Sequence, residues 1–312
     1  MTEDVLLRAL DPERDRAQLE RLWEAALGPV WPLLPGALDI VERGVVAELG
    51  HHEGPGTGNR GIGHPGGRVV GVVAVDPAGS IPLLLVDPAH QRRGVGTRLL
   101  EAGMARLGEL GATTVGLGSG GDDYIWPGVP DDLPGAVGFF RARGWDFDHT
   151  VIDLVADLRG YEAPDGVGER PAEAGVSIQV MAEPERAEVM AFEVATFPEW
   201  VVWFERLDSS VLVARDRAGN VVGTLLFRGP LGATIYEPML GPQTGTIGCV
   251  GVAAPARGAG VGSAMVARAS ELLRDAGTRA CHIGWTQREQ FYARVGYAPW
   301  RRYHMARRPA SG

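Results

Sequence analysis

The sequence contains no lysine, only two cysteines and no long apolar run, so all 30 of its basic residues are arginines. We interpret the bias toward arginine as compositional. Cys249 and Cys281 cannot form a framework of several disulfides, and reduced structural thiols are the simplest interpretation. No apolar segment approaches the roughly 20 residues of a membrane span. The N-terminus also lacks a basic segment followed by an apolar one. These absences predict a cytoplasmic protein that does not enter a membrane.

Clustered positive charge is also missing. The net charge is −9 at pH 7, and residues 1–165 carry 14 Arg against 25 Asp and Glu, whereas residues 166–312 carry 16 against 14. Binding to nucleic acid phosphates needs clustered cations, so we expect no nucleic-acid partner. An acidic surface instead raises the local concentration of a cationic ligand. The charge pattern therefore suits a small amine.

The most informative feature is a stretch that occurs twice, at residues 83–108 and 247–273. In each copy an apolar, strand-like run leads into a glycine-rich turn, and a helical pattern follows. The turn residues are Gln91, Gly94 and Gly96 in the first copy and Arg257, Gly260 and Gly262 in the second. A strand, a glycine turn and a helix N-terminus together form an anion site, because the first N–H groups of a helix have no partner in the helix itself.

Two common nucleotide-binding patterns do not fit these turns. A dinucleotide fingerprint needs a third glycine, and Leu99 and Met265 occupy its place. Neither copy contains the Gly-Lys-Ser/Thr of a nucleotide-triphosphate loop. The pattern Gln/Arg-x-x-Gly-x-Gly after an apolar strand instead resembles the pyrophosphate loop of the GNAT acetyltransferases.

The resemblance implies an α/β fold of two tandem GNAT domains, each a mixed twisted sheet flanked by helices. We place a non-catalytic domain at residues 1–160 and the catalytic domain at residues 174–312, with a linker at 159–175. Both halves are short of a strand after their last helix, and shared or exchanged closing strands would explain this.

By the same resemblance, the second turn holds the pyrophosphate of acetyl-CoA, and the strand before it faces the pantetheine arm. Gly248 and Gly251 in that strand indicate a bulge or a close backbone approach. The implied cofactor-binding residues are Val250, Val252, Arg257, Gly258, Ala259, Gly260, Val261, Gly262 and Ser263. The matching residues of the first half are Val86, Gln91, Arg92, Arg93, Gly94, Val95, Gly96 and Thr97. The first loop could be structural, a vestigial binding site or part of the acceptor pocket.

A second family signature is a tyrosine four residues before a Gly-aromatic pair. Tyr292 precedes Gly296 and Tyr297 in this way, and the resemblance makes Tyr292 the acid that protonates the leaving thiolate. A packed helix aromatic is the alternative. Phe140 stands at the matching place of the first half and has no hydroxyl. We therefore assign catalysis to the C-terminal half.

The general base and the acceptor contacts are less defined. We take Glu237 as the base, and further carboxylates without diagnostic spacing are Glu199, Asp208 and Glu289. The first half carries about 14 extra residues at 118–135, because the repeat offset shrinks from 166 to 152 there. Candidate substrate contacts are Trp285, Thr286, Asp123, Tyr124 and Trp126.

Two further clusters have simpler explanations. Cys249 and His282 could act as a nucleophile pair, but a buried structural pair is favoured. The histidines at 51, 52 and 64 match no standard metal-ligand spacing and lie in a glycine-rich loop, so we expect no metal.

Within the family, the chain is similar to bacterial tandem enzymes that acetylate glucosamine and glucosaminides, and mycothiol synthase is the sister possibility. The expected reaction is acetyl transfer to a primary amine by direct attack in a ternary complex. The alternative is a non-catalytic acyl-CoA-binding or sensing protein. The sequence leaves the oligomeric state open.

Overall fold

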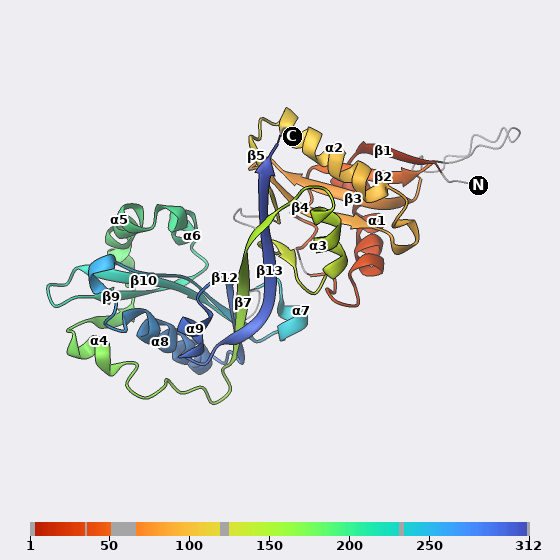
Figure 1. Cartoon of the computed structure of the whole chain (residues 1–312). Coiled ribbons are helices and arrows are strands. Elements are labelled where there is room, and N and C mark those ends of the chain that lie inside the picture. The colour runs from red at the N-terminus through yellow and green to blue at the C-terminus, as the bar shows by residue number, and fades with distance from the viewer. Residues whose placement is uncertain (1–3, 35, 51–66, 119–124, 231–233, 311–312) are drawn as a thin grey trace, which may run out of the picture. The chain divides into compact units, whose positions relative to one another are not determined.

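The computed structural model describes residues 4–34, 36–50, 67–118, 125–230 and 234–310. The chain forms two compact units (Figure 1), which comprise Met1–Thr150 with Tyr303–Gly312 and Val151–Arg302. His51, His52, His64, Asp123 and Tyr124 lie outside the described residues. Across the described ranges, no group of acidic, histidine and cysteine side chains could hold a metal ion, and no helix is long and apolar enough to span a bilayer.

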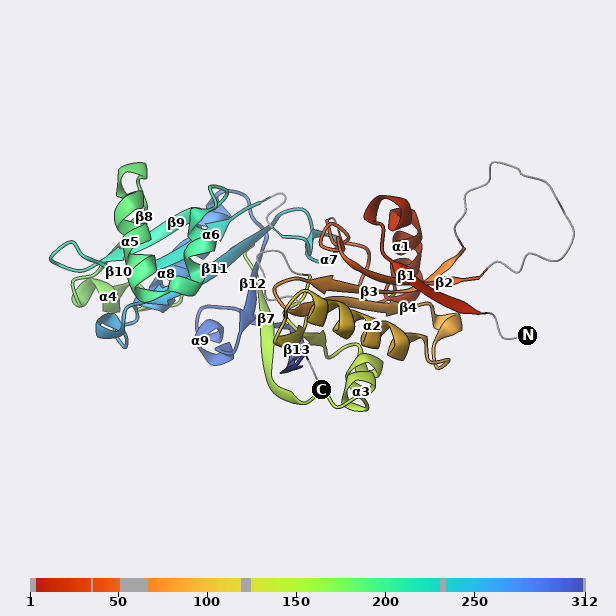
Figure 2. The ribbon, with the colours of Figure 1, turned by 90° about the horizontal axis from the view of Figure 1, so that it is seen from above.

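Unit 1 is a twisted sheet with strand order β1-β2-β3-β4-β5-β13, in which β4 and β5 run parallel. Helices α1 and α2 cover opposite faces of this sheet (Figure 2). Its elements are β1 (Val5–Ala9), α1 (Pro12–Ala26), β2 (Gly44–Leu49), β3 (Val69–Asp76), β4 (Ser80–Val86), η1 (Pro88–His90), α2 (Val95–Glu109), β5 (Thr114–Leu117), β6 (Val129–Pro130), α3 (Pro134–Arg141) and the start of β7 (Phe147–Asp157).

Unit 2 repeats this plan with strand order β7-β12-β11-β10-β9-β8, in which β11 and β12 run parallel. Helices α5 and α6 lie on one face, and α8 lies on the other (Figure 1). Its elements are α4 (Glu169–Glu173), β8 (Ser177–Val180), η2 (Glu183–Glu185), α5 (Arg186–Thr196), η3 (Pro198–Trp200), α6 (Val201–Glu205), β9 (Ser210–Arg215), β10 (Val221–Arg228), α7 (Glu237–Leu240), β11 (Thr244–Val252), η4 (Ala254–Ala256), α8 (Val261–Asp275), β12 (Ala280–Thr286), α9 (Glu289–Ala293) and the start of β13 (Ala298–Pro309).

The closing strand of each sheet comes from the other half of the sequence. Residues 307–309 pair with β5 in unit 1, and residues 152–157 pair with β12 in unit 2. This exchange explains the missing strand in each half. The units therefore divide at Thr150 and Arg302, and not within residues 159–175 where we expected the linker.

The expected linker is part of unit 2. It contains the short helix α4, and Tyr161 is buried with its hydroxyl donating to the Val295 carbonyl at 3.0 Å. The segment therefore packs on the unit that follows it, and does not act as a free connector.

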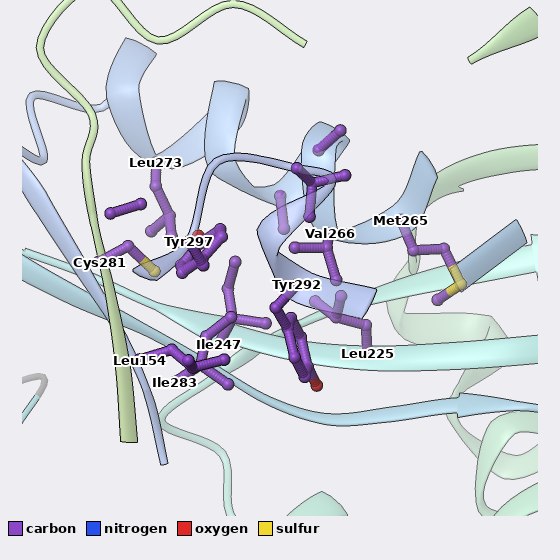
Figure 3. Packing of buried hydrophobic residues seen from close by; sticks show 14 of the residues in the cluster. Leu154, Leu225, Ile247, Met265, Val266, Leu273, Cys281, Ile283, Tyr292 and Tyr297 are labelled. Carbon is purple, nitrogen blue, oxygen red and sulfur yellow. The ribbon is translucent and has the colours of Figure 1, made fainter. Parts of the chain in front are cut away.

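The core of unit 2 lies beneath α8 (Figure 3). Buried Val261, Met265, Ala269 and Leu273 recur every four residues, which places them on one face of the helix. The helix ends at Asp275, and Gly277 follows it with a φ of 89°, the left-handed conformation that favours glycine after a helix.

Candidate active site

The second glycine turn presents unpaired backbone donors at the start of α8. Gly260 caps the helix with φ 83° and ψ 2°. The first helical bond runs from Ala264 N–H to Gly260 O at 3.0 Å, so the N–H groups of Val261, Gly262 and Ser263 lie outside the helical ladder. Three such groups at the positive end of a 15-residue helix form a site for an anion.

Both copies of the turn need their last glycine for the same steric reason. A Cβ on Gly262 would lie 3.2 Å from Phe291 Cζ, and a Cβ on Gly96 would lie 3.2 Å from Phe139 Cε2. The phenylalanine before Tyr292 and the one before Phe140 therefore cover the same turn of the two helices. The sequence repeat is thus a repeat of packing as well.

The first residue of each motif secures the strand end to the loop. Arg257 Nε donates to Val252 O at 2.9 Å, and Gln91 Nε2 donates to Val86 O at 3.1 Å. Through these bonds the first residue of each motif holds its loop in shape, which both arginine and glutamine can do. A contact of the Arg257 side chain, or of neighbouring arginines, with the pyrophosphate stays a prediction.

A second arginine lies beside the turn and was not singled out from the sequence. Arg170 of α4 has its Cβ 3.5 Å from where a Cβ on Gly260 would stand. The segment that we expected to be a linker thus brings an arginine side chain next to Gly260. No signal in the sequence around Arg170 indicates this, because the contact depends on how residues 159–175 pack.

The first loop has the same turn but a different surrounding. Gly94 has a φ of 83°. Arg92 has a positive φ of 62°, and Gly258, at the matching place of the second loop, has a φ of 88°. Arg143 donates to Thr97 Oγ1 through Nε at 3.0 Å, so the first turn of α2 already receives hydrogen bonds from a cation of unit 1.

Strand β11 carries a bulge next to the turn. Two steps along β10, from Thr224 to Leu226, oppose three steps along β11, from Gly251 to Gly248. Cys249 takes up the extra residue with φ 49°. This confirms the prediction from the two glycines, and Gly251 also receives the Phe197 ring, which a Cβ would approach to 2.4 Å.

Unit 1 lacks the bulge at the matching place. Val72 pairs with Leu85 and Val73 with Leu84 in regular register, and the register shifts only farther from the turn, between Ala74 and Asp76. A bulge leaves backbone groups unpaired and re-aims the strand, so unit 2 offers such groups closer to its turn than unit 1 does.

The strands also separate at this point. The parallel pairing of β11 with β12 runs from Thr244 and Ala280 to Thr246 and His282, and both strands continue beyond it. A narrow substrate arm could therefore lie alongside Val250 and Val252.

Tyr292 lies at the bulge from the α8 side of the sheet. It is 7% exposed, and its hydroxyl points away from Tyr297 and Cys281 at the edge of the core (Figure 3). Across the described residues this hydroxyl has no hydrogen-bond partner. Burial, and then Cys249, raise the pKa of Tyr292 above its usual range. The phenol therefore stays protonated and can donate. Phe140 is buried at the matching place of unit 1.

A buried carboxyl group approaches the bulge from the α5 side. Glu193 is 0% exposed, and Thr224 Oγ1 donates to its Oε1 at 2.5 Å. Burial raises the pKa of Glu193 to about 7, the Thr224 hydrogen bond lowers it and Glu199 raises it. We did not single out Glu193 from the sequence. The available signal was its position one helical turn after Val189, on the buried face of α5.

The cysteine–histidine nucleophile does not fit the structure. Burial raises the pKa of Cys249 to about 12, with Glu193 and Glu199 adding to the effect, and burial likewise raises the pKa of Cys281 to about 12. Both thiols are therefore protonated at neutral pH, whereas a nucleophilic cysteine acts as thiolate.

His282 belongs instead to a buried polar cluster. Its Nε2 lies 3.1 Å from Asp153 Oδ2, and Asp153 Oδ1 accepts from the Trp285 N–H at 2.8 Å. Trp285 has φ 50°, so the Asp153 bond holds an unusual backbone conformation at the end of β12, next to Thr286. The exchanged strand β7 thus supplies the carboxylate that shapes this end of unit 2.

The structure also places Trp126 and Glu237, which we predicted to be a substrate contact and the general base. Trp126 is 7% exposed and packs in unit 1 against Trp23 and Trp31, with ring centroids 5.8 and 5.2 Å away. We therefore revise Trp126 from a substrate contact to a core residue. Glu237 begins α7 beside Tyr236, whose buried ring lies 5.0 Å from that of His282.

A known protein family matches both parts of the chain that carry a glycine-rich turn. The sequence profile of the acetyltransferase (GNAT) family matches residues 63–145 and 178–297, together more than half of the chain. The chain belongs to this family. GNAT enzymes are acetyltransferases, and acetyl-CoA is their general acyl donor.

Curated relatives of the chain include several mycothiol acetyltransferases. The mycothiol acetyltransferase of Clavibacter sepedonicus is 30% identical over 223 residues, which cover 66% of this chain and 64% of that protein. The match thus spans less than two thirds of that relative. The mycothiol acetyltransferase of Rhodococcus opacus (strain B4) is 28% identical over 285 residues, or 84% of this chain and 86% of that protein.

Solved GNAT structures share the whole tandem fold. A glucosamine N-acetyltransferase region of a fungal multi-domain β-N-acetylglucosaminidase aligns with a TM-score of 0.84 at 27% identity, over 99% of this chain and 38% of that one. A tandem GNAT protein from the clavulanic acid biosynthesis pathway aligns with a TM-score of 0.62 at 17% identity, over 99% of both chains. The second likeness shows the fold alone.

Proposed function

We propose that the protein transfers an acetyl group from acetyl-CoA to a primary amine of a small molecule, and that unit 2 is the catalytic unit. One observation carries this proposal. Among the described residues, unit 2 combines the helix-terminal anion site with a bulge at Cys249 near the turn and the buried hydroxyl of Tyr292. Unit 1 has the turn, but Phe140 stands in place of the tyrosine, and the register shift of its strands, between Ala74 and Asp76, lies farther from the turn.

The residues of unit 2 fit the donor. The N–H groups of Val261, Gly262 and Ser263 would bind the diphosphate, and a side chain at Gly262 would press on the Phe291 ring that packs against this turn. Acetyl-CoA supplies the acyl group as a thioester when bound. The strand between Val250 and Val252 would orient that end, and Tyr292 holds the proton that the departing sulfur takes.

For the acceptor we favour an amino sugar. The likeness to the glucosamine N-acetyltransferase region supports this, because it covers 99% of this chain at 27% identity. The acceptor of mycothiol acetyltransferases is the second candidate, supported by the curated relatives.

An assay of thiol release tests the proposal. The purified chain is incubated with acetyl-CoA and separately with glucosamine, glucosaminides, the mycothiol acetyltransferase substrate, polyamines and amino acids. We expect amine-dependent release of CoA thiol, highest with an amino sugar. Acetyl-CoA binding by calorimetry without thiol release from any amine would instead support a non-catalytic acyl-CoA-binding protein.

A further inference from the structure

We propose that Glu193 is the proton acceptor for the amine that attacks the thioester. This inference rests on the acetyl transfer proposed above and names a base other than Glu237.

Packing alone does not explain the buried side chain of Glu193. Thr224 Oγ1 donates to one carboxyl oxygen, Oε1, whereas Oε2 is buried without a hydrogen-bond partner in the part of the chain that the structure describes. An unpaired buried carboxyl oxygen is costly. Proteins keep such groups mainly where chemistry uses them.

Glu193 lies beside the bulge of β11, because Thr224, which donates to its carboxyl group, pairs with Gly251. Its titratable neighbours are the Cys249 thiol on β11 and Glu199 on η3, and both Glu193 and Glu199 act on the pKa of Cys249. Cys249 is the left-handed residue of the bulge and packs against the cluster beneath α5 and α6. Tyr292 belongs to the core beneath α8, and the same thiol raises the pKa of its hydroxyl. The bulge is therefore flanked by the acid on one face and a carboxyl group on the other.

Exposed Glu199 fits the approach of a cation. It lies near enough to raise the pKa of Glu193. A carboxylate at the surface attracts an ammonium group, and a second one inside receives its proton.

Unit 1 provides an internal comparison. Thr224 pairs with Gly251, and the matching pair of unit 1 is Val72 with Leu85, so the residue that orients Glu193 is apolar there. The buried acid of α1, Asp15, is instead paired with Arg8 at 2.7 Å. At the matching places, unit 1 thus lacks the threonine and the phenol, and its register shift lies elsewhere, between Ala74 and Asp76, as expected if the three features serve one reaction in unit 2.

The proton and electron balance is complete. The Glu193 carboxylate takes one proton from R–NH₃⁺, and the nitrogen lone pair forms the C–N bond at the thioester carbon. The C–S bond then breaks, and the sulfur takes the Tyr292 proton. The second proton lost by nitrogen restores the phenol, and Glu193 releases its proton to solvent. The products are the amide, the CoA thiol and one proton.

The test is the pH profile of kcat/KM for Glu193→Gln, which keeps the shape of the side chain and the Thr224 contact. For the wild-type protein we expect kcat/KM to rise with pH up to about 7 and then level off. In the variant, this rise of kcat/KM with pH, the acid limb of the profile, should be lost. Its kcat/KM should be about 10²-fold lower at pH 7, and its affinity for acetyl-CoA should be unchanged. Its activity should recover at higher pH, where the acceptor amine deprotonates unaided.

Two further variants separate catalysis from packing. Thr224→Val, which installs the residue of unit 1, removes a bond that lowers the pKa of Glu193, so the acid limb should move to higher pH. Glu188→Gln alters an exposed carboxylate of the same helix that pairs with Arg215, and should keep the wild-type profile.

Two outcomes overturn the assignment of Glu193: an unchanged profile in Glu193→Gln, or loss of the limb in Glu237→Gln instead. These outcomes need an active wild-type protein. If the wild-type protein releases no thiol with any amine, the proposed function fails first, so the two failures are distinguishable.

Discussion

Glu193 is a buried carboxylic acid that has no cationic partner among the residues that the structure describes, and such a group makes folding depend on pH. Burial raises the pKa of Glu193 from its ordinary 4.5 to about 7 in the folded chain. The folded state therefore binds more protons between these values, and its stability falls as pH rises through them. The shift corresponds to about 3 kcal/mol lost by pH 8.

Glu193→Gln should remove this loss. Urea denaturation at pH 5 and pH 8 should show a variant more stable than the wild-type protein at pH 8 and similar to it at pH 5. Equal pH dependence of the two proteins would mean that Glu193 titrates normally. The exposed-site variant Glu188→Gln serves as the matched control.

Individual residues were predictable from the sequence only where a motif or a repeat marked them. Comparison of Tyr292 with Phe140 needs no structure, because both lie four residues before a glycine–aromatic pair. Glu193 and Arg170 carry no motif, and their surroundings arise from tertiary packing. Trp126 was misread, because an aromatic residue in an insertion can fill a core as well as bind a ligand.

The two glycine turns allow a matched test at the scale of an element. Gly260 and Gly94 share a φ of 83°, a conformation that costs a residue with a side chain about 1 kcal/mol. We expect Gly260→Ala to weaken acetyl-CoA binding in the reaction about tenfold through a distorted loop, whereas Gly94→Ala should leave KM for acetyl-CoA unchanged. The reverse result in steady-state kinetics would place the productive donor site in unit 1.

Most elements could be read from periodicity and turn residues. The strands before both glycine turns and the helices after them lie close to the predicted ranges, although β11 begins at Thr244, three residues before the expected Ile247. The bulge was predictable from Gly248 and Gly251, but the left-handed residue is Cys249, between them. Glycines mark where backbone space is needed, and the register of the sheet decides which residue takes the bend.

The exchange of closing strands is a property of the whole molecule. Truncation after Arg302 removes the residues that pair with β5, so hydrogen exchange in residues 114–117 of unit 1 should rise strongly, while β12 of unit 2 keeps its protection. Truncation after Pro309 keeps the pairing and should behave like the full chain. Unchanged protection of β5 in the shorter chain would contradict the pairing.

The sequence indicated a missing strand in each half but not its source. Pairing between residues far apart in the chain depends on edge matching that local patterns do not encode, and this also explains why the unit boundaries differ from the predicted 160 and 174. The duplication itself, and with it the family, followed directly from the repeated motif.

We infer that unit 2 alone performs acetyl transfer, with the Tyr292 hydroxyl as the acid. Thiol release with the best amine should fall about 10²-fold or more in Tyr292→Phe at unchanged acetyl-CoA affinity, and adding Phe140→Tyr should not restore it. Tyr161→Phe, which removes another hydroxyl of unit 2, should keep the wild-type kcat. Wild-type turnover in Tyr292→Phe, or its recovery on adding Phe140→Tyr, would contradict the claim.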